Sequence, residues 1–220
     1  SRIAAILADP RSPATTLIAT PGGGIWRTED AGISWTPITE STASLPFCDL
    51  VRDPSNVDIL YAGTGDARYP TPDQGVLRSS DNGRTWSASL SFSNSAVCSL
   101  AVDPTDGRRI AAASDDGLFL SVDSGATWRR LQNSVFTAVS FDAQGKLYAA
   151  RLGTSDPSAG PLGSRASLLL TSANGGATFS TVVLPETAGS AGAKTTHVAL
   201  LARAAEVYAA VSYIPADGGS

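Results

Sequence analysis

Carboxylates are the side chains of this sequence most able to do chemistry. The 220 residues include 20 aspartates and glutamates but one histidine, His197, which disfavours a histidine-built metal site or a histidine-activated nucleophile. Two carboxyl groups facing each other across a cleft, about 5 Å or about 6.5 to 9.5 Å apart, can hydrolyse a glycosidic bond. Asp66 and Asp73 share one loop and Asp115 and Asp116 share a tight turn, but the sequence pairs none of them across a cleft. We therefore predict no catalytic, metal-binding or cofactor-binding residue.

Other aspartates recur in an eight-residue motif, Ser/Thr-x-Asp-x-Gly-x-Ser/Thr-aromatic. Its copies are TEDAGISW (28–35), SSDNGRTW (79–86), SVDSGATW (121–128) and the weaker SANGGATF (172–179). The third positions are 51, 42 and 51 residues apart, so the motif marks a structural repeat. The residues expected to form it are Asp30, Gly32 and Trp35; Asp81, Gly83 and Trp86; Asp123, Gly125 and Trp128; and Asn174, Gly176 and Phe179.

A turn-forming role explains the residue types of the motif. A short carboxylate can accept hydrogen bonds from backbone N–H groups of its own turn. The glycine can adopt a positive φ or allow close approach, and the aromatic ring can enter the core between neighbouring repeats. In the fourth copy, Asn174 can still accept hydrogen bonds and Phe179 can still pack. We therefore expect the motif to lock a hairpin rather than to catalyse a reaction.

Short apolar runs flank each motif in a constant order. A run ending in an aspartate comes first, at Asp9, Asp53, Asp103 and Asp142, and two further runs precede the motif. Such runs, separated by Gly, Pro, Asp and Asn, predict antiparallel strands, and no stretch has sustained helical periodicity. Each repeat is therefore predicted to be a meander of four strands, A to D. Repeats of about 40 to 50 residues indicate the blades of a β-propeller.

The fold prediction is an all-β propeller of four four-stranded antiparallel blades and part of a fifth. The blades are placed at about 1–44, 45–94, 95–134, 135–190 and 191–220 of one domain, 1–220. A ring closes only when its last blade packs on its first, so we expect an incomplete part of a larger ring. If the chain were complete, its open blade edges would favour self-association.

The four in-phase motifs resemble the Asp-box, or BNR, repeat of β-propeller proteins over nearly the whole chain. That family includes sialidases, xyloglucan-cleaving glycoside hydrolases, sortilin-type receptor domains and a photosystem II assembly factor. The resemblance implies a ring of about seven blades, a structural role for the boxes and a bacterial, secreted or extracytoplasmic setting. Two signatures depart from it. The sialidase Arg-Ile-Pro near the start is missing, and PGGGIWRTED (21–30) does not match the xyloglucanase-like start, with its catalytic aspartate beside a Gly-Gly-Ala-Tyr run.

Strand order places the motif turns on one face of the disc and the B–C loops on the other. From the strand-A aspartate to the third motif position the separations are 21, 28, 20 and 32 residues, so extra residues lie in the B–C loops at 63–75 and 151–165. Loops on a rigid scaffold gather binding residues. The candidate ligand-binding residues are Asp66, Arg68, Tyr69, Asp73, Arg151, Asp156 and Arg165. The alternative is that these loops are solvated insertions, which cost little stability.

The functional prediction is a non-catalytic propeller that binds a protein or carbohydrate ligand through its B–C loop face. The alternative is a sialidase- or xyloglucanase-like glycoside hydrolase whose catalytic carboxylates lie partly outside this chain. The net charge of -4 and pI near 4.9 disfavour nonspecific binding to nucleic acid. No window is long and apolar enough to span a bilayer.

Cys48 and Cys98 each lie five residues before a strand-A aspartate and so hold equivalent positions in neighbouring blades. Because equivalent positions point the same way around a ring, we expect two buried thiols that do not face each other, rather than a disulfide. His197 aligns with the same position of the fifth blade, where an inner-strand role is expected rather than a ligand role.

Overall fold

The computed structural model describes residues 2–39, 46–65, 74–92, 95–152, 167–184, 194–203 and 206–214. Every regular element in these ranges is a β-strand, which confirms the all-β prediction. Within the same ranges there is no helix long and apolar enough to cross a membrane.

The strands form four four-stranded sheets and one two-stranded sheet, each an antiparallel meander in chain order. The first sheet contains β1 (Ala5–Asp9), β2 (Ser12–Thr20), β3 (Gly24–Thr28) and β4 (Thr36–Pro37). The second contains β5 (Phe47–Arg52), β6 (Leu60–Thr64), β7 (Gln74–Ser79) and β8 (Ser87–Phe92). The third contains β9 (Val97–Asp103), β10 (Asp106–Ser114), β11 (Gly117–Ser121) and β12 (Arg129–Gln132). The fourth contains β13 (Phe136–Phe141), β14 (Leu147–Arg151), β15 (Leu168–Ser172) and β16 (Ser180–Val183), and the fifth contains β17 (Lys194–Arg203) and β18 (Glu206–Ile214).

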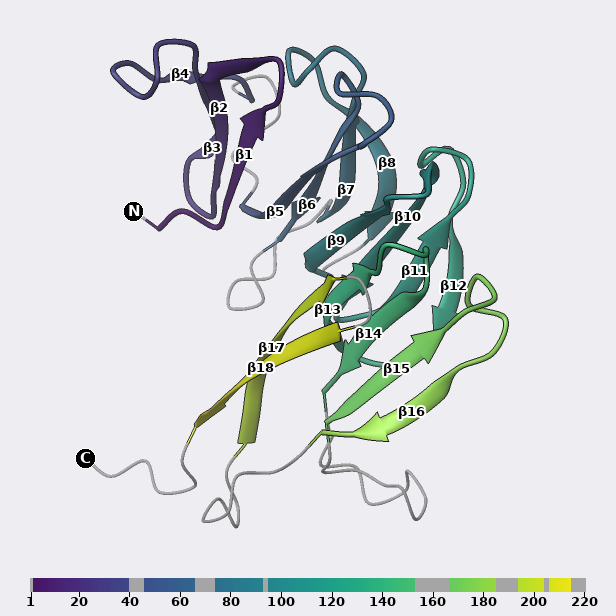
Figure 1. The fold of residues 1–220 in the computed structure, drawn as a ribbon. Coiled ribbons are helices and arrows are strands. Elements are labelled where there is room, and N and C mark those ends of the chain that lie inside the picture. The colour runs from purple at the N-terminus through teal and green to yellow at the C-terminus, as the bar shows by residue number, and fades with distance from the viewer. Residues whose placement is uncertain are drawn as a thin grey trace, which may run out of the picture.

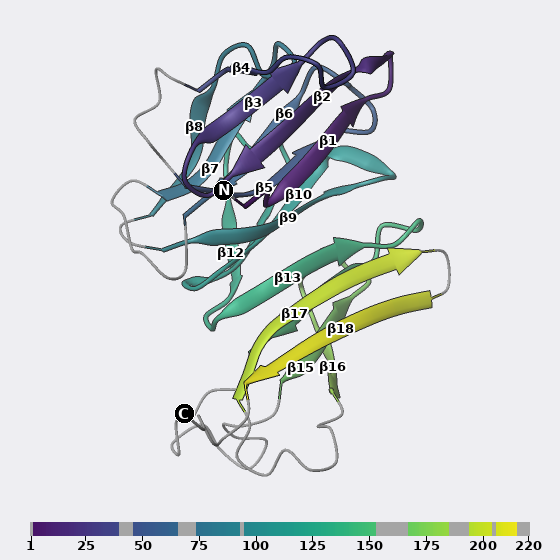
Figure 2. The same ribbon diagram turned by 90° about the vertical axis from the view of Figure 1, so that its left-hand side faces the viewer.

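The sheets stand side by side as the blades of a partial β-propeller (Figures 1 and 2). Neighbouring blades meet through their first strands: β1 contacts β5, β5 contacts β9, β9 contacts β13 and β13 contacts β17. The predicted four blades and partial fifth are therefore present, whereas the residue numbers proposed for the blade boundaries stay a prediction.

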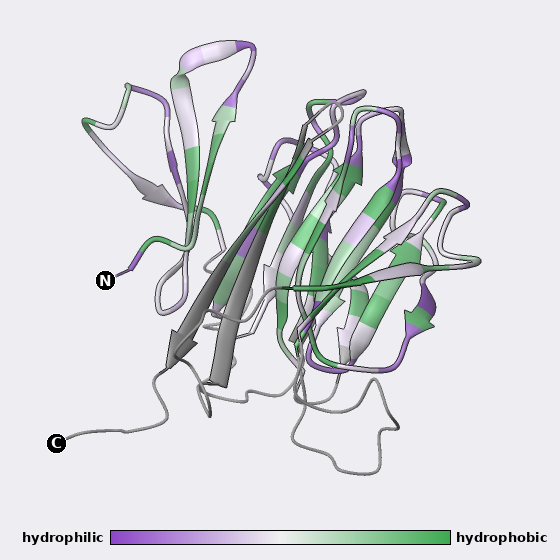
Figure 3. Ribbon diagram, turned by 60° about the horizontal axis from the view of Figure 1, so that its bottom comes forward, coloured by the Kyte–Doolittle hydropathy of each residue, from purple (hydrophilic) through white to green (hydrophobic). Residues whose placement is uncertain are grey.

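The cores lie between consecutive blades, and hydrophobic residues are concentrated along the strands while the turns are more hydrophilic (Figure 3). Leu17 and Ile25 of the first blade pack with Leu50 and Leu60 of the second. Equivalent clusters join the second blade to the third and the third to the fourth. Because one face of each blade is covered by the next, the strands can be short and still bury apolar surface on both sides.

In the second, third and fourth blades, the strand-A position three residues before the strand-A aspartate faces the preceding blade. Leu50, Leu100 and Val139 occupy it in the second, third and fourth blades and are 4 to 5% exposed. Ile6 occupies it in the first blade and is 67% exposed. No described residue covers Ile6 as the preceding blade covers the other three, so the first blade has an uncovered apolar face.

The first three motif turns have the same hydrogen bonds, and the fourth differs from them in one bond. In the second blade, Thr85 donates to Asp81 from its N–H at 2.8 Å and from its hydroxyl at 2.6 Å, and Ser79 Oγ accepts from the Gly83 N–H at 2.8 Å. The turns at Asp30 and Asp123 repeat this pattern. In the fourth turn an amide replaces the carboxylate, and Asn174 donates to the Thr178 hydroxyl while accepting from its N–H. Each turn thus supplies its own hydrogen bonds, which explains why it forms locally.

The motif aromatics face the preceding blade. Trp86, Trp128 and Phe179 are partly buried against the three inter-blade clusters. Trp35 belongs to none of these clusters and is 36% exposed, and no described blade covers it as the preceding blade covers the other three aromatics. Entry of the aromatic ring into an inter-blade core, expected of every copy, therefore does not occur in the first.

Candidate binding face

The meander separates two faces of the propeller. The A–B turns and the motif turns lie at one end of the strands, and the B–C turns lie at the other, which we call the loop face. The glycine-rich segment at 21–23 forms a tight B–C turn between β2 and β3. There Trp26 Nε1 donates to the Gly23 carbonyl at 2.6 Å.

Most of the sequence-predicted ligand-binding residues lie outside the described residues. These are Asp66, Arg68, Tyr69, Asp73, Asp156 and Arg165. Arg151 is described and ends β14, where it is paired with Phe136 on one side and Leu168 on the other. It is partly buried, and among the described residues its buried Nε has no hydrogen-bond partner. Arg151 therefore carries a positive charge at the loop face, at the end of β14 and two residues before 153.

The turn between β10 and β11 places two carboxylates on the loop face. Asp116 forms an ion pair with Arg130 of β12, and the Arg130 guanidinium lies over the Phe119 ring, 5.1 Å from its centroid. Asp115 is exposed as a residue, yet partial burial of its carboxyl group raises its pKa. Of these two groups, Asp115 is the one without an ion pair among the described residues, so it is the one available to hydrogen-bond a ligand.

Asp49 was missed by the sequence analysis. It lies in β5 beside Cys48, and its carboxylate accepts hydrogen bonds from the Leu50 N–H at 2.8 Å and from the Leu100 N–H of β9 at 2.7 Å. Burial raises the pKa of Asp49, while these two N–H donors act in the opposite direction. Ser99 repeats the bridge one blade on, accepting from the Val139 N–H at 3.1 Å. The detectable signal was a polar residue four positions before the strand-A aspartate in both blades.

The two cysteines correct a prediction. Cys48 Sγ and Cys98 Sγ are 3.2 Å apart, so the side chains face each other rather than pointing the same way around the ring. Both are thiols and both are only partly buried. In the fifth blade, register places His197 opposite Ser212, and the residue skipped in the pairing is Thr196. Thr196, not His197, is therefore equivalent to the cysteines.

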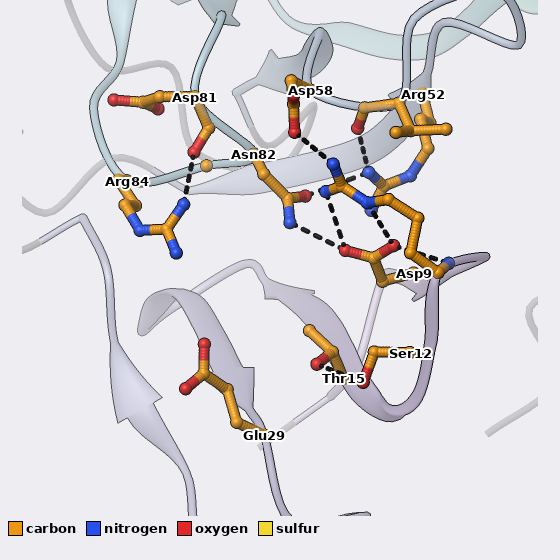
Figure 4. A network of polar contacts seen from close by, with 12 residues as sticks. Asp9, Ser12, Thr15, Glu29, Arg52, Asp58, Asp81, Asn82 and Arg84 are labelled. Carbon is orange, nitrogen blue, oxygen red and sulfur yellow. Dashed lines mark hydrogen bonds and ion pairs between the residues drawn. The ribbon is translucent and has the colours of Figure 1, made fainter.

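The opposite face carries a polar network between the first two blades (Figure 4). Asp9 is 5% exposed and accepts hydrogen bonds from Arg11 at 3.2 Å and from Asn82 Nδ2 at 2.7 Å. Arg52 donates to Asn82 Oδ1 at 2.9 Å, and Arg11 also pairs with Asp58 at 2.8 Å. The Arg11 hydrogen bond is the main reason that the pKa of Asp9 lies well below its usual range. This network joins two blades through hydrogen bonds and ion pairs between its own members, so it is structural. Arg52 Nε and Nη2 have no hydrogen-bond partner among the described residues.

A shallow groove of about 400 Å³ also lies on the motif face, between β8 and the third motif turn. Its lining includes Arg78, Ser89 and Asp123. Asp123 is held by Thr127 and Ser121, and Ser89 donates to the Gly125 carbonyl at 2.6 Å. Asp123 and Ser89 are thus occupied in holding the turn, whereas the buried Arg78 Nε has no hydrogen-bond partner among the described residues. Among the described residues, no group of three His, Cys, Asp or Glu side chains is placed to hold a metal ion.

Comparison with known proteins gives two sequence relatives, both xyloglucanases. No family profile matches the chain. A xyloglucanase of Paenibacillus sp is 32% identical, over 50% of this chain and 12% of the relative. A xyloglucanase of Hypocrea jecorina is 30% identical, over 60% of this chain and 18% of the relative. The chain therefore spans less than a fifth of the length of these two curated relatives.

Solved structures with a similar fold include GH74 enzymes. An ancestral GH74 enzyme has a TM-score of 0.71 at 15% identity, over 90% of this chain and 27% of its own. The GH74 xyloglucanase from Xanthomonas campestris has a TM-score of 0.60 at 24% identity, over 89% and 32%. YCF48 bound to D1 peptide has a TM-score of 0.56 at 14% identity, over 90% and 58%. These likenesses establish the fold of the chain, which is that of a β-propeller, here in part.

Proposed function

We propose that this chain is part of a β-propeller that binds a β-glucan of the xyloglucan class on its loop face. The observation that carries the proposal is the sequence similarity to two xyloglucanases, at 32% and 30% identity. The loop face supports it with polar groups suited to sugar hydroxyls: the Asp115 carboxyl group, the Asp116–Arg130 pair and the Arg151 guanidinium. The candidate residues at 66–73, 156 and 165 lie outside the described residues, in segments that follow Gly65 and Leu152 in the sequence.

The repeated turns are, in this proposal, Asp-box turns with a structural role. The carboxylates of the first three turns are occupied by hydrogen bonds within each turn. The Ser34 hydroxyl and N–H hold the pKa of Asp30 at about 2, and Thr127 does the same for Asp123. A carboxylate with so low a pKa remains ionised at neutral pH and is a poor general acid. Ligand binding is therefore assigned to the loop face rather than to the boxes.

Binding without hydrolysis is the leading form of the proposal. Hydrolysis by a carboxylate pair needs one carboxylic acid and one carboxylate across a cleft. On the described part of the loop face, Asp49 is occupied by two backbone N–H groups and Asp116 by Arg130. Burial raises the pKa of Asp115, and of these carboxyl groups it is the one that a general-acid role would use. A glycoside hydrolase would need a second carboxylate from 66–73 or from outside this chain, and that is the alternative function.

The binding proposal is tested by calorimetric titration of the chain with xyloglucan oligosaccharides, with mannan oligosaccharides for comparison. We expect saturable binding of the xyloglucan series, with affinity reduced at least about fivefold, or about 1 kcal/mol, in Asp115→Asn or Arg151→Gln. Glu29→Gln on the motif face is the matched control and should bind as the parent chain does. Absence of binding to xyloglucan, with folding intact by circular dichroism, would refute the proposal.

Measuring reducing-sugar release from xyloglucan in the same samples distinguishes the alternative, a glycoside hydrolase, from binding without hydrolysis. Release that disappears in Asp115→Asn but persists in Asp116→Asn would establish hydrolysis with Asp115 as the acid. Binding without release supports the leading form. A protein ligand remains the competing partner class, since a similarly folded structure is YCF48 bound to D1 peptide, and it would be favoured if every glycan titration were flat.

A further inference from the structure

Cys48 and Cys98 face each other at the interface between the second and third blades. Cys48 Sγ and Cys98 Sγ are 3.2 Å apart, and Cys48 Sγ also donates to the Gly65 carbonyl at 2.6 Å. The two residues come from β5 and β9, which contact each other directly as innermost strands. They are 50 residues apart in the sequence, so the contact is made by blade packing and not by a local turn.

Matching β-bulges aim the two side chains. Phe47 pairs with Thr64 and Asp49 with Gly63, which leaves Cys48 as the extra residue of β5. Ser99 pairs with Ala113 and Val97 with Ser114, which leaves Cys98 as the extra residue of β9. A bulged residue leaves the alternation of the strand and its side chain is re-aimed. This is why two residues at equivalent positions meet instead of pointing the same way.

Two neighbouring contacts hold the strands at this separation. The Asp49 carboxylate, one residue after Cys48, accepts from the Leu100 N–H of β9 at 2.7 Å and so ties the two inner strands together. Gly63 of β6 has the Val97 carbonyl oxygen only 2.4 Å from the place that a Cβ would occupy. The absence of a side chain at Gly63 therefore lets β9 approach the second blade, which brings Cys98 to Cys48.

We propose that Cys48 and Cys98 are a disulfide-forming site that covalently joins the second and third blades when a disulfide donor is present. The thiolate of one cysteine attacks a sulfur of the donor, such as glutathione disulfide, giving a mixed disulfide and one released thiol. The other cysteine then attacks the protein sulfur of that mixed disulfide and releases the second thiol. The donor gains two electrons, and the two protons of the cysteines end on the two released thiols.

The bond changes two properties of the molecule. It closes a loop of 50 residues across an interface between blades, which restricts the unfolded chain and raises the melting temperature by roughly 5 to 10 °C. It also removes the S–H group that Cys48 donates to Gly65, the last described residue before 66–73. The Gly65 N–H keeps its hydrogen bond to the Pro46 carbonyl at 2.8 Å.

The test is to equilibrate the folded chain with glutathione at a series of thiol-to-disulfide ratios and then label remaining thiols with a maleimide. Intact mass should change from two labels to none, with no glutathione retained and no increase in chain number. Peptide mapping should find Cys48 joined to Cys98 within one chain. The oxidised form should melt roughly 5 to 10 °C above the reduced form.

The matched controls are Cys48→Ser and Cys98→Ser, each checked for folding by circular dichroism. Each should retain one reactive thiol and show no oxidation-dependent rise in melting temperature. The Asp49→Asn variant, which keeps both thiols but weakens the tie to Leu100, should shift the oxidation midpoint to more oxidising ratios. Two labels persisting at the most oxidising ratio, stable glutathione adducts, or disulfides only between chains would each overturn the proposal.

Discussion

Asn82 Nδ2 donates a 2.7 Å hydrogen bond to Asp9 Oδ2 across the boundary between the first two blades. The two residues are 73 positions apart in the sequence. Asn82 belongs to the second motif turn and has a left-handed backbone, with φ 58°, and Asp9 is a strand-A aspartate. The bond therefore ties the strand-A aspartate of the first blade to the motif turn of the second blade.

Lowering the pH should reduce the stability of the fold, partly because Asp9 becomes protonated. Its pKa is lowered in the folded state, chiefly by the hydrogen bond from Arg11, so the ionised group stabilises the fold above the unfolded-state pKa of about 3.9 and this contribution is lost as pH falls further. Urea unfolding at pH 7 and pH 3 should show Asp9→Asn about 1 kcal/mol less stable at pH 7, with the difference shrinking at pH 3. An unchanged difference at the two pH values would contradict this.

The motif tryptophans Trp86 and Trp35 should contribute differently to the free energy of unfolding. Trp86→Ala should lower the free energy of unfolding by about 2 kcal/mol, because the ring is partly buried against the apolar cluster that contains Leu17 and Leu60. Trp35→Ala should cost under about 1 kcal/mol, because Trp35 is 36% exposed and lies outside the clusters. Denaturant titration of both variants measures the contrast, and equal losses would show that the first motif is packed like the second.

The motif glycines separate backbone strain from packing. Gly32 and Gly125 both have positive φ, 93° and 80°, so alanine at either should cost about 1 kcal/mol. At Gly125 a Cβ would also lie 2.6 Å from Ser89 Oγ, whereas at Gly32 the nearest atom is in Trp35 at 3.9 Å. Gly125→Ala should therefore be about 1 to 2 kcal/mol more destabilising than Gly32→Ala. Melting curves of the two variants test this order, and a melting temperature of Gly125→Ala equal to or above that of Gly32→Ala would contradict it.

Equivalent apolar positions should tolerate charge differently. Leu50→Asp buries a carboxylate under the first blade and should cost at least about 3 kcal/mol. Ile6→Asp changes a residue that is 67% exposed and should cost under about 1 kcal/mol. Equilibrium unfolding checks both variants. A large loss at Ile6 would mean that another surface covers it in solution.

Much of the fold could be read from the sequence because its signals are local. The motif at 79–86 contains both partners of its hydrogen bonds, Asp81 and Thr85, four residues apart. The apolar runs between such turns predict strands, and their order predicts a meander. The candidate ligand-binding residues could not be predicted from a local motif, since Asp66 and Asp73 are assigned to a loop only by the extra length of their repeat.

The sequence by itself determined the repeat, the strands and the turns, because each depends on residues close together along the chain. Tertiary structure alone decided that Cys48 faces Cys98, that Asp49 bridges to Leu100 and that Ile6 remains exposed. These depend on bulges and on which blade lies beside which. A repeat makes positions equivalent in sequence, but their environments differ because each blade is covered only by the neighbours it has.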